Sequence, residues 1–317
     1  MKPPLLILTG PTGVGKSALS IALAKAIDGE IVSADSMQVY RQMDIGSAKI
    51  MPNEQEGIPH HLIDVLAPDE EFHVVKFQQL AKEAIVKIYE RGRIPIVVGG
   101  TGFYIQALLY DIDFTEAEQN SLARRKWENI AQTRGTDALH QMLQEVDPEA
   151  ARQIHHNNVK RVIRGLEFYT QTGEKISSHN ITQREKESPY TYAYFVLNEE
   201  RERLYQRINE RVDDMMKKGL VEEVAKLKAQ GYHKDMVSMQ GLGYKEILTY
   251  LDEGCMLEDA IYQLKRDTRH FAKRQLTWFR REKEVIWLNK QDFDYNEEAL
   301  LQKMLGVLGS KGIRICS

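Results

Sequence analysis

A glycine-rich loop near the amino terminus has the residue types that bind a diphosphate or triphosphate. The loop reads Gly10-Pro11-Thr12-Gly13-Val14-Gly15-Lys16-Ser17. It follows an apolar segment, Leu5–Leu8, and precedes a helical pattern from Ala18 to Ala26. In a strand–loop–helix unit of this kind the glycines let backbone N–H groups point at a phosphate, while the lysine adds positive charge and the serine offers a hydroxyl to Mg²⁺. The sequence therefore predicts an anion-binding site at this loop, with Ser17 as its magnesium ligand.

Two further reactive groups stand where neighbouring strands are predicted to end. Asp35 follows the apolar run Glu30–Ala34, and Thr101 follows Ile94–Val98 and two glycines. Ligands of a parallel sheet bind at the carboxyl ends of its strands, so we expect both residues to lie beside the phosphate loop. A carboxylate in that place can act as the general base for an acceptor nucleophile. The alternatives are a helix cap or magnesium ligand for Asp35 and a plain turn residue for Thr101.

The strand at Ile94–Val98 lacks the acidic residue with which many nucleotide hydrolases of this loop class hold Mg²⁺. It ends in Gly99-Gly100-Thr101 instead, and the acid at a strand end is Asp35. The pattern therefore favours a group-transfer enzyme over a hydrolytic switch.

Three arginines recur at helical spacing in the carboxyl-terminal half. Arg203, Arg207 and Arg211 share one helix face, and apolar residues occupy another face of the same helix. Such a stripe is often a solvated surface, and nearby glutamates offer partners. Guanidinium groups close to a phosphate loop also suit an anionic leaving group, so we predict that Arg211 binds the leaving diphosphate.

Two stretches concentrate positive charge in a chain whose formal net charge is only −3. The first, Lys265–Arg281, contains seven basic residues and one acid. Its residues on one helix face are Arg266, Arg269, Lys273 and Arg280. The second is the turn formed by Lys160, Arg161 and Arg164. Concentrated basic faces on a near-neutral protein suit a polyanion such as RNA, and a solvated charged surface is the alternative.

The order of predicted elements indicates an α/β fold with an inserted helical region. The predicted strands are Leu5–Leu8, Glu30–Ala34, Ile94–Val98, Tyr192–Leu197 and Val285–Leu288. Helical patterns such as Val74–Arg91 separate them, which predicts a parallel sheet flanked by helices. The inserted helices are predicted at Glu116–Thr133, Asp137–Glu145, Pro148–Ile154 and Asn158–Thr170. We therefore predict a core of residues 1–113 and 190–317 and an all-helical insertion of residues 114–189.

Composition excludes several classes of protein. The chain has 317 residues, 42% of them hydrophobic, which is enough for a sizeable core. Its two cysteines, Cys255 and Cys316, exclude a disulfide scaffold and a cysteine zinc site. His60, His61 and His73 lack a third type of metal ligand at a recognisable spacing and are interpreted as structural. No signal peptide or membrane span is found, so we expect a cytoplasmic monomer without a membrane partner.

Eight sequence motifs together carry a family resemblance. They are GPTGVGKS at Gly10–Ser17, ADSMQVYR at Ala34–Arg41, GIPHHLID at Gly57–Asp64, VVGGTGFY at Val97–Tyr104, KRVIRGLE at Lys160–Glu167, RINERVDDM at Arg207–Met215, GLGYKE at Gly241–Glu246 and TRHFAKRQLTWFR at Thr268–Arg280. The set resembles that of the bacterial tRNA dimethylallyltransferases, in the same order and over nearly the whole chain. The resemblance implies a sheet like that of the phosphate-loop nucleoside kinases.

The resemblance also implies a reaction. In that family a dimethylallyl group passes from dimethylallyl diphosphate to N6 of the adenosine that follows the anticodon of tRNA on its 3′ side, and diphosphate is released. Asp35 would be the base, Thr101 would contact the reacting groups, Arg211 and the phosphate loop would bind diphosphate, and Mg²⁺ would be the cofactor. The insertion would hold the anticodon stem–loop. The tRNA-contacting residues that we expect are Asp35, Ser36, Met37, Gln38, Thr101, Arg124, Lys160, Arg161, Arg164, Gly243 and Lys273.

Three other functions are compatible with parts of the pattern. A small-molecule kinase of the phosphate-loop class would transfer phosphate from ATP and would have little use for two basic faces. An adenylate isopentenyltransferase would act on free adenine nucleotides and would not need the helical insertion. An RNA-binding module that uses nucleotide only as a switch is disfavoured by the missing hydrolase-type acid.

Overall fold

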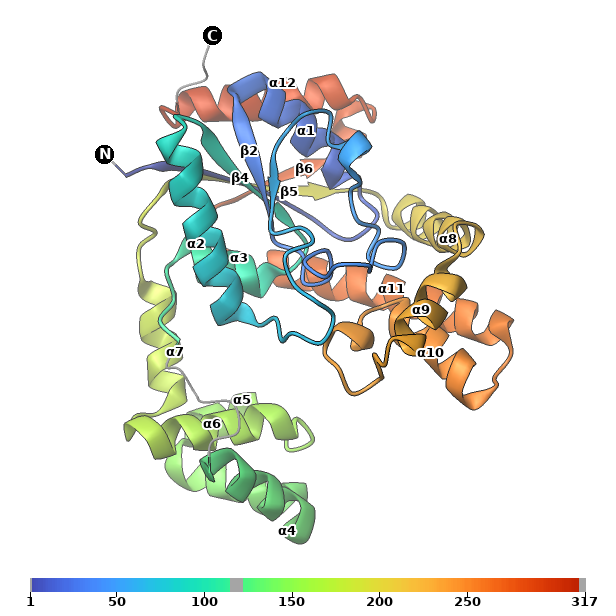
Figure 1. Cartoon of the computed structure of the whole chain (residues 1–317). Helices are drawn as coiled ribbons and strands as arrows, with labels where there is room; N and C mark the ends of the chain where they lie inside the picture. Colours follow the sequence, from blue (N-terminus) through green and yellow to red (C-terminus); the bar gives the residue numbers. More distant parts are fainter. Residues whose placement is uncertain (1, 115–121, 314–317) are drawn as a thin grey trace. The chain divides into compact units, whose positions relative to one another are not determined.

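The computed structural model describes residues 2–114 and 122–313. The chain forms two compact units, one made of residues 1–109 and 189–317 and the other of residues 110–188 (Figure 1). Each unit has its own cluster of buried apolar side chains.

A parallel β-sheet organises the first unit. In spatial order its strands are β3 (His60–His61), β2 (Gly29–Ser33), β4 (Ile94–Gly99), β1 (Pro4–Thr9), β5 (Thr191–Asn198) and β6 (Val285–Asn289). Leu8 of β1 pairs in parallel with Val98 of β4 on one side and with Phe195 of β5 on the other. All five predicted strands are present, whereas β3 is too short to produce a pattern in the sequence.

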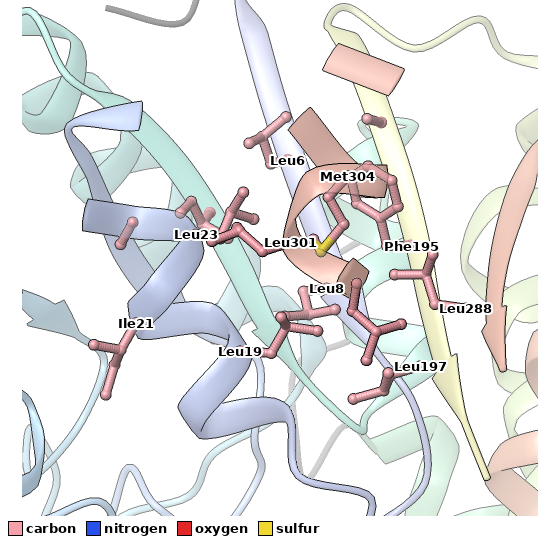
Figure 2. Packing of buried hydrophobic residues seen from close by; sticks show 14 of the residues in the cluster. Leu6, Leu8, Leu19, Ile21, Leu23, Phe195, Leu197, Leu288, Leu301 and Met304 are labelled. Carbon is pink, nitrogen blue, oxygen red and sulfur yellow. The ribbon is translucent and has the colours of Figure 1, made fainter. Parts of the chain in front are cut away.

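Helices cover the sheet, and β1 shows how the core holds it. The covering helices are α1 (Lys16–Ile27), α2 (Val74–Glu90), α3 (Gly102–Leu109) and α12 (Glu297–Ser310). Leu6 and Leu8 pack in one apolar cluster with Leu19 of α1 and with residues of α12 (Figure 2). Leu5 and Ile7 are equally buried but lie outside that cluster. Both faces of β1 are therefore covered, which fits a central parallel strand and fixes the point where the phosphate loop begins.

The chain after β5 is mostly helical, as its sequence predicts. The helices there are α8 (Arg201–Lys217), α9 (Leu220–Ala229), α10 (Tyr244–Glu253) and α11 (Leu257–Phe279). Short 3-10 helices occupy Pro52–Glu54, Ser238–Gln240 and Lys290–Phe293. Helix α11 contacts α8 and α10 and also α3, so it links the α8–α10 group to a helix that follows a sheet strand (Figure 1).

The second unit is helical throughout its described residues. Its helices are α4 (Leu122–Val146), α5 (Pro148–Gln153), α6 (Val159–Thr172) and α7 (Ile176–Glu185). Helix α4 breaks at Gly135, where φ is 85° and ψ is 167°, between the predicted helices Glu116–Thr133 and Asp137–Glu145. Residues 116–121 of that first prediction lie outside the described residues. Helix α7 carries little apolar periodicity, which explains why the sequence does not predict it.

The histidine pair has a structural role at the edge of the sheet. His61 Nε2 lies 2.6 Å from the Glu30 carboxylate, which also accepts hydrogen bonds from Arg91 and Arg93. Burial raises the pKa of Glu30, but hydrogen bonds from Arg91 and His61 lower it overall to about 2. The described residues contain no group of three or more His, Cys, Asp or Glu that could hold a metal ion.

Two other sequence expectations concern the cysteines and the membrane. Cys255 carries a free thiol, and Cys316 lies outside the described residues. None of the helices that the structure describes is both long enough and apolar enough to cross a membrane.

Candidate active site

A cavity of about 610 Å³ opens at the carboxyl ends of β1, β2 and β4. The predicted site residues that line it are Thr12, Gly13, Gly15, Lys16, Ser17, Asp35, Ser36, Met37, Gln38, Thr101 and Arg211. Gly10, Pro11 and Val14 belong to the same loop but lie behind its lining. The ends of three strands and helix α8 thus bring together groups that are up to 199 residues apart in the sequence, from Thr12 to Arg211.

The phosphate loop leads directly into helix α1. Gly15, the residue before α1, has φ 98° and, as a glycine, has no side chain with which to cap the first turn. Lys16 Nζ donates to the carbonyl oxygens of Gly10 at 3.0 Å and Pro11 at 2.9 Å, so the lysine folds over its own loop. Gly10 is required by close packing as well as by its φ of 149°, because a Cβ there would overlap the Leu197 carbonyl. The loop is therefore shaped for an anion.

Asp35 both shapes a turn and keeps one oxygen available. Its Oδ1 accepts hydrogen bonds from the backbone N–H groups of Met37 at 2.8 Å and Gln38 at 3.3 Å. No described residue donates to its other oxygen, Oδ2. The capping role and the role as a base are thus compatible, because each uses a different oxygen of the carboxylate.

Thr101 directly precedes α3 and lines the cavity. Its backbone N–H donates to the Ala34 carbonyl at 3.3 Å, which ties the end of β4 to the residue before Asp35. Its hydroxyl makes no hydrogen bond to another described residue. The Thr101 hydroxyl is therefore available to a ligand. The backbone of Thr101 also stabilises a turn, which is the alternative role considered for this residue in the sequence analysis.

The three stripe arginines on α8 have different surroundings. Arg203 is exposed and lies 3.7 Å from the ring of Tyr295. Arg207 lies 3.5 Å from the buried carboxylate of Glu199, and Arg211 lines the cavity. Burial lowers the pKa of Arg211, whereas nearby Asp35 raises it. A charged guanidinium thus faces the site without a hydrogen bond to any described residue.

Positive charge at the loop is only partly compensated. The pKa of Lys16 is lowered to about 8, because burial and the charge of Arg211 lower it more than the charge of Asp35 raises it. A bound diphosphate would supply the missing negative charge and favour the ammonium form of the lysine.

Diphosphate binding is expected to weaken as the pH rises through about 8, the pKa of Lys16. Above that pH the free protein holds a neutral amine, so binding must take up a proton that the ligand then stabilises. Calorimetric titration with inorganic diphosphate, in two buffers that differ in ionisation enthalpy, measures this uptake. In the control variant Lys16→Arg the guanidinium stays charged, and no uptake is expected in that range. Equal proton uptake by both proteins would contradict the assignment.

One oxygen donor in the cavity, the Ser17 hydroxyl, suits Mg²⁺. Ser17 is exposed at the start of α1, and its hydroxyl is not hydrogen-bonded to the described residues. Mg²⁺ commonly takes one or two protein oxygens and completes its shell with water and substrate phosphates. The donor set therefore fits a metal bound together with a diphosphate.

The cavity wall beyond the loop is apolar and aromatic. Ile31 and Val98 contribute from the strands, and Phe72 and Tyr104 contribute aromatic rings. Tyr104 stacks on Phe77 with ring centroids 4.8 Å apart and meets Phe72 edge-on at 5.6 Å. An anion site that continues into an apolar wall fits a ligand with a diphosphate head and a hydrocarbon chain.

The basic face of α11 is paired along its first half and unpaired along its second half. Lys265 Nζ lies 2.6 Å from the Asp213 carboxylate, and Arg269 donates to Asn209 at 2.6 Å. The exposed residues without an ion pair among the described residues are Lys273, Arg274, Arg280 and Arg281. Three of them, Lys273, Arg274 and Arg281, line a hollow of about 430 Å³ together with His270, Thr277 and Trp278. Arg274 lines both this hollow and the cavity, so the two adjoin.

The remaining predicted residues lie outside the cavity. Gly243 precedes α10 with φ 93°, a left-handed conformation that favours glycine, and a Cβ there would make only an ordinary contact, 3.5 Å from Gly46 Cα. In the second unit, Lys160 and Arg161 are exposed on α6. The Arg164 guanidinium lies 3.9 Å from the carboxylate of buried Glu167. Burial lowers the pKa of Arg164, the charge of Glu167 raises it, and the charge of Arg124 lowers it; the overall shift is downward.

Three side chains that the sequence analysis does not single out support the site. Glu223 of α9 accepts hydrogen bonds from the backbone of Asp44, Ile45 and Gly46, in the loop that continues along the cavity wall. Lys290 is buried with its Nζ 3.4 Å from the Val14 carbonyl. Gln275 of α11 bonds to the phosphate loop. Each lies far from its partner in the sequence, so no local spacing reveals these contacts.

Comparison with known proteins identifies the family of the chain. The family model described as IPP transferase matches residues 38–282. The chain belongs to this family. It is 60% identical to the tRNA dimethylallyltransferase of Lachnoclostridium phytofermentans over 98% of this chain and 99% of that protein. It is 50% identical to the Carboxydothermus hydrogenoformans enzyme of the same name, over 95% and 94% of the two chains.

Solved structures of IPP transferases share the fold. The full-length tRNA isopentenylpyrophosphate transferase of Bacillus halodurans is 44% identical, with a TM-score of 0.73 over 98% of both chains. A eukaryotic dimethylallyltransferase whose structures were solved as it acts on tRNA is 32% identical to this chain, with a TM-score of 0.84. The match covers 99% of this chain and 81% of the eukaryotic chain. The predicted family and α/β fold are thus confirmed.

Proposed function

We propose that this chain is a tRNA dimethylallyltransferase, which transfers the dimethylallyl group of dimethylallyl diphosphate to N6 of the adenosine 3′-adjacent to the anticodon. The observation that carries the proposal is one cavity in which an anion loop, an available carboxylate oxygen and an apolar wall meet. Its membership of the IPP transferase family points to the same reaction. A tRNA substrate implies a cytoplasmic enzyme, which we expect to act as a monomer.

The site residues then have separate roles in the transfer. The N6 amine attacks the allylic carbon, a new C–N bond forms, and the bond to the diphosphate oxygen breaks. Asp35 Oδ2 takes the proton that the amine loses. Lys16, the loop N–H groups and Arg211 stabilise the charge that develops on the diphosphate. Mg²⁺, held by Ser17 and the diphosphate, would supply further charge neutralisation.

The adenine has to leave the anticodon loop to reach this cavity. A base stacked in RNA cannot approach a buried diphosphate, so we expect it to be flipped out. The unpaired basic residues of α11 lie next to the cavity and suit the backbone of the displaced loop. Phosphate contacts would position the tRNA, and the shape of the cavity would select the base.

One assay separates this function from its rivals. The protein is incubated with radiolabelled dimethylallyl diphosphate and Mg²⁺, together with either unmodified tRNA or free AMP, ADP or ATP. Label that enters only tRNA supports the proposal, and label on free nucleotides identifies an adenylate isopentenyltransferase. Transfer of phosphate from ATP, without any prenyl transfer, would identify a kinase.

Lys160 and Arg161, in the basic turn of the second unit, are expected to contact tRNA and to have no effect on the binding of dimethylallyl diphosphate. In the double variant Lys160→Ala with Arg161→Ala, each lost phosphate contact should make the negative slope of log K against log [salt] less steep by about 0.7. Filter-binding titrations at several salt concentrations measure this slope. Lys87 and Lys303 are exposed on α2 and α12 and give a control variant with the same change in charge. An equal slope in both double variants would remove α6 from the tRNA interface.

A further inference from the structure

The side chain of Gln275 connects two separate loops of the active site. Its Oε1 accepts a hydrogen bond from the Thr12 backbone N–H at 2.9 Å, and its Nε2 donates to the Gly100 carbonyl at 2.9 Å. The amide orientation is fixed because one neighbour can only donate and the other can only accept. Gln275 is 6% exposed, so water does not replace these bonds easily. The phosphate loop and the turn that carries Thr101 are thus joined through one side chain.

Helix α11 packs closely against the turn that carries Thr101. A Cβ on Gly100 would overlap the Gln275 amide, and a Cβ on Gly102 would overlap the indole of Trp278, one turn further along α11. The two glycines therefore allow α11 to approach the Thr101 turn closely. A shift of α11 would move both loops, because closely packed interiors transmit displacement.

The same helix carries exposed positive charge on another face. Lys273 and Arg274 directly precede Gln275 in the chain, and both are exposed. An RNA that binds these side chains would act on the helix segment that holds the two loops. Gln275 is the only residue of that segment with hydrogen bonds to both loops among the described residues.

We propose that Gln275 is a positioning residue that couples tRNA binding to diphosphate binding, by holding the phosphate loop and the Thr101 turn in one arrangement on the RNA-binding helix. The inference rests on the proposed function. Coupling between two ligands is reciprocal, so it appears as a ratio of diphosphate affinities in the presence and absence of tRNA.

The first test measures that ratio with inorganic diphosphate and Mg²⁺ as the probe. Calorimetric titrations are made on the full chain alone and on its complex with unmodified tRNA. In the wild type we expect the two affinities to differ by at least about fivefold, the low end of ordinary coupling. In Gln275→Leu the ratio should fall close to one while tRNA affinity stays within about twofold, since no basic residue is removed. A wild-type ratio of one, or an unchanged ratio in the variant, would overturn the proposal.

A matched control lies on the same helix. Gln263 Nε2 donates to Asp267, one turn away, and among the described residues its side chain has no hydrogen bond to either loop. Gln263→Leu removes an amide of the same kind and should keep the wild-type ratio. A loss of coupling in both variants would mean that α11 itself had been disturbed, and the role assigned to Gln275 would be wrong.

The second test uses pH to restore the missing donor. In Gln275→Glu the ionised carboxylate still accepts from Thr12 but repels the Gly100 carbonyl oxygen. Protonation at low pH returns an O–H donor and thus both hydrogen bonds. The single-turnover rate of this variant, divided by that of the wild type, should therefore rise as the pH falls. The charged side chains that line the same cavity, Lys16, Asp35, Arg211 and Arg274, are present in both proteins, so their contributions cancel in the ratio.

The outcomes distinguish this proposal from the proposed function. A flat ratio across pH would refute the bridging role of Gln275, even where labelled tRNA is still produced by the wild type. Failure of the wild type to label tRNA at all would refute the proposed function instead.

Discussion

Replacement of Asp35 by asparagine is expected to slow single-turnover prenyl transfer by about 10²–10⁴-fold, the usual contribution of a positioned general base. Asparagine keeps an Oδ1 that accepts from the backbone N–H groups of Met37 and Gln38, so the turn should persist. It removes only the proton acceptor that the available Oδ2 provides. Rapid-quench measurement of labelled tRNA gives the rate, and separate titrations should show nearly unchanged affinities for tRNA and diphosphate.

Asp35→Ala is the informative companion to this variant. Alanine loses the proton acceptor and also the two hydrogen bonds of the turn, so it should lower the free energy of unfolding by about 1 kcal/mol more than asparagine does. The rate constants of the two variants should nevertheless be similar. If asparagine transferred the prenyl group at the wild-type rate while alanine did not, Asp35 would have only the turn role.

The sequence predicts the strand ends of this site better than its walls. Leu5–Leu8, Glu30–Ala34 and Ile94–Val98 are short apolar runs whose ends can be read directly, and a parallel sheet must bring such ends together. The phosphate loop, Asp35 and Thr101 therefore line one cavity, as the spacing of their strands predicts.

The helices of the site are harder to interpret from sequence. Periodicity places Arg203, Arg207 and Arg211 on one face but does not say what that face meets. In the structure Arg203 meets Tyr295 and Arg207 meets Glu199, and these partners lie outside the helix. Contacts of this kind depend on tertiary packing, which no local pattern encodes.

Charge counts have a similar limit along α11. The sequence shows seven basic residues in Lys265–Arg281 and does not show which of them have partners. In the structure Lys265 forms an ion pair with Asp213, and Arg269 donates a hydrogen bond to Asn209. Only the second half keeps unpaired charge among the described residues. The Gln275 bridge is invisible in the sequence for the same reason, since its partners Thr12 and Gly100 lie 263 and 175 residues away.

Arg211→Gln is expected to reduce kcat/KM for dimethylallyl diphosphate by about 10²–10³-fold, as for the loss of one donor that stabilises developing negative charge. Affinity for tRNA should change little, because Arg211 lines the diphosphate cavity. Arg203→Gln is the matched control: it changes the same side chain two turns earlier on α8, where the guanidinium lies over Tyr295. We expect its kinetics to stay within about twofold of wild type, as for a surface contact.

The same pair of variants also tests the electrostatics of the loop. Burial, Asp35 and Arg211 together set the pKa of Lys16 at about 8, and Arg211 acts to lower it, so removal of Arg211 should raise that pKa. The pH at which diphosphate binding begins to weaken should therefore move upward in Arg211→Gln. Asp35 raises the pKa of Lys16, so Asp35→Asn should move the same midpoint downward. Shifts of opposite sign require both groups to act on Lys16 across one cavity, and shifts of the same sign would show that the lysine responds to something else.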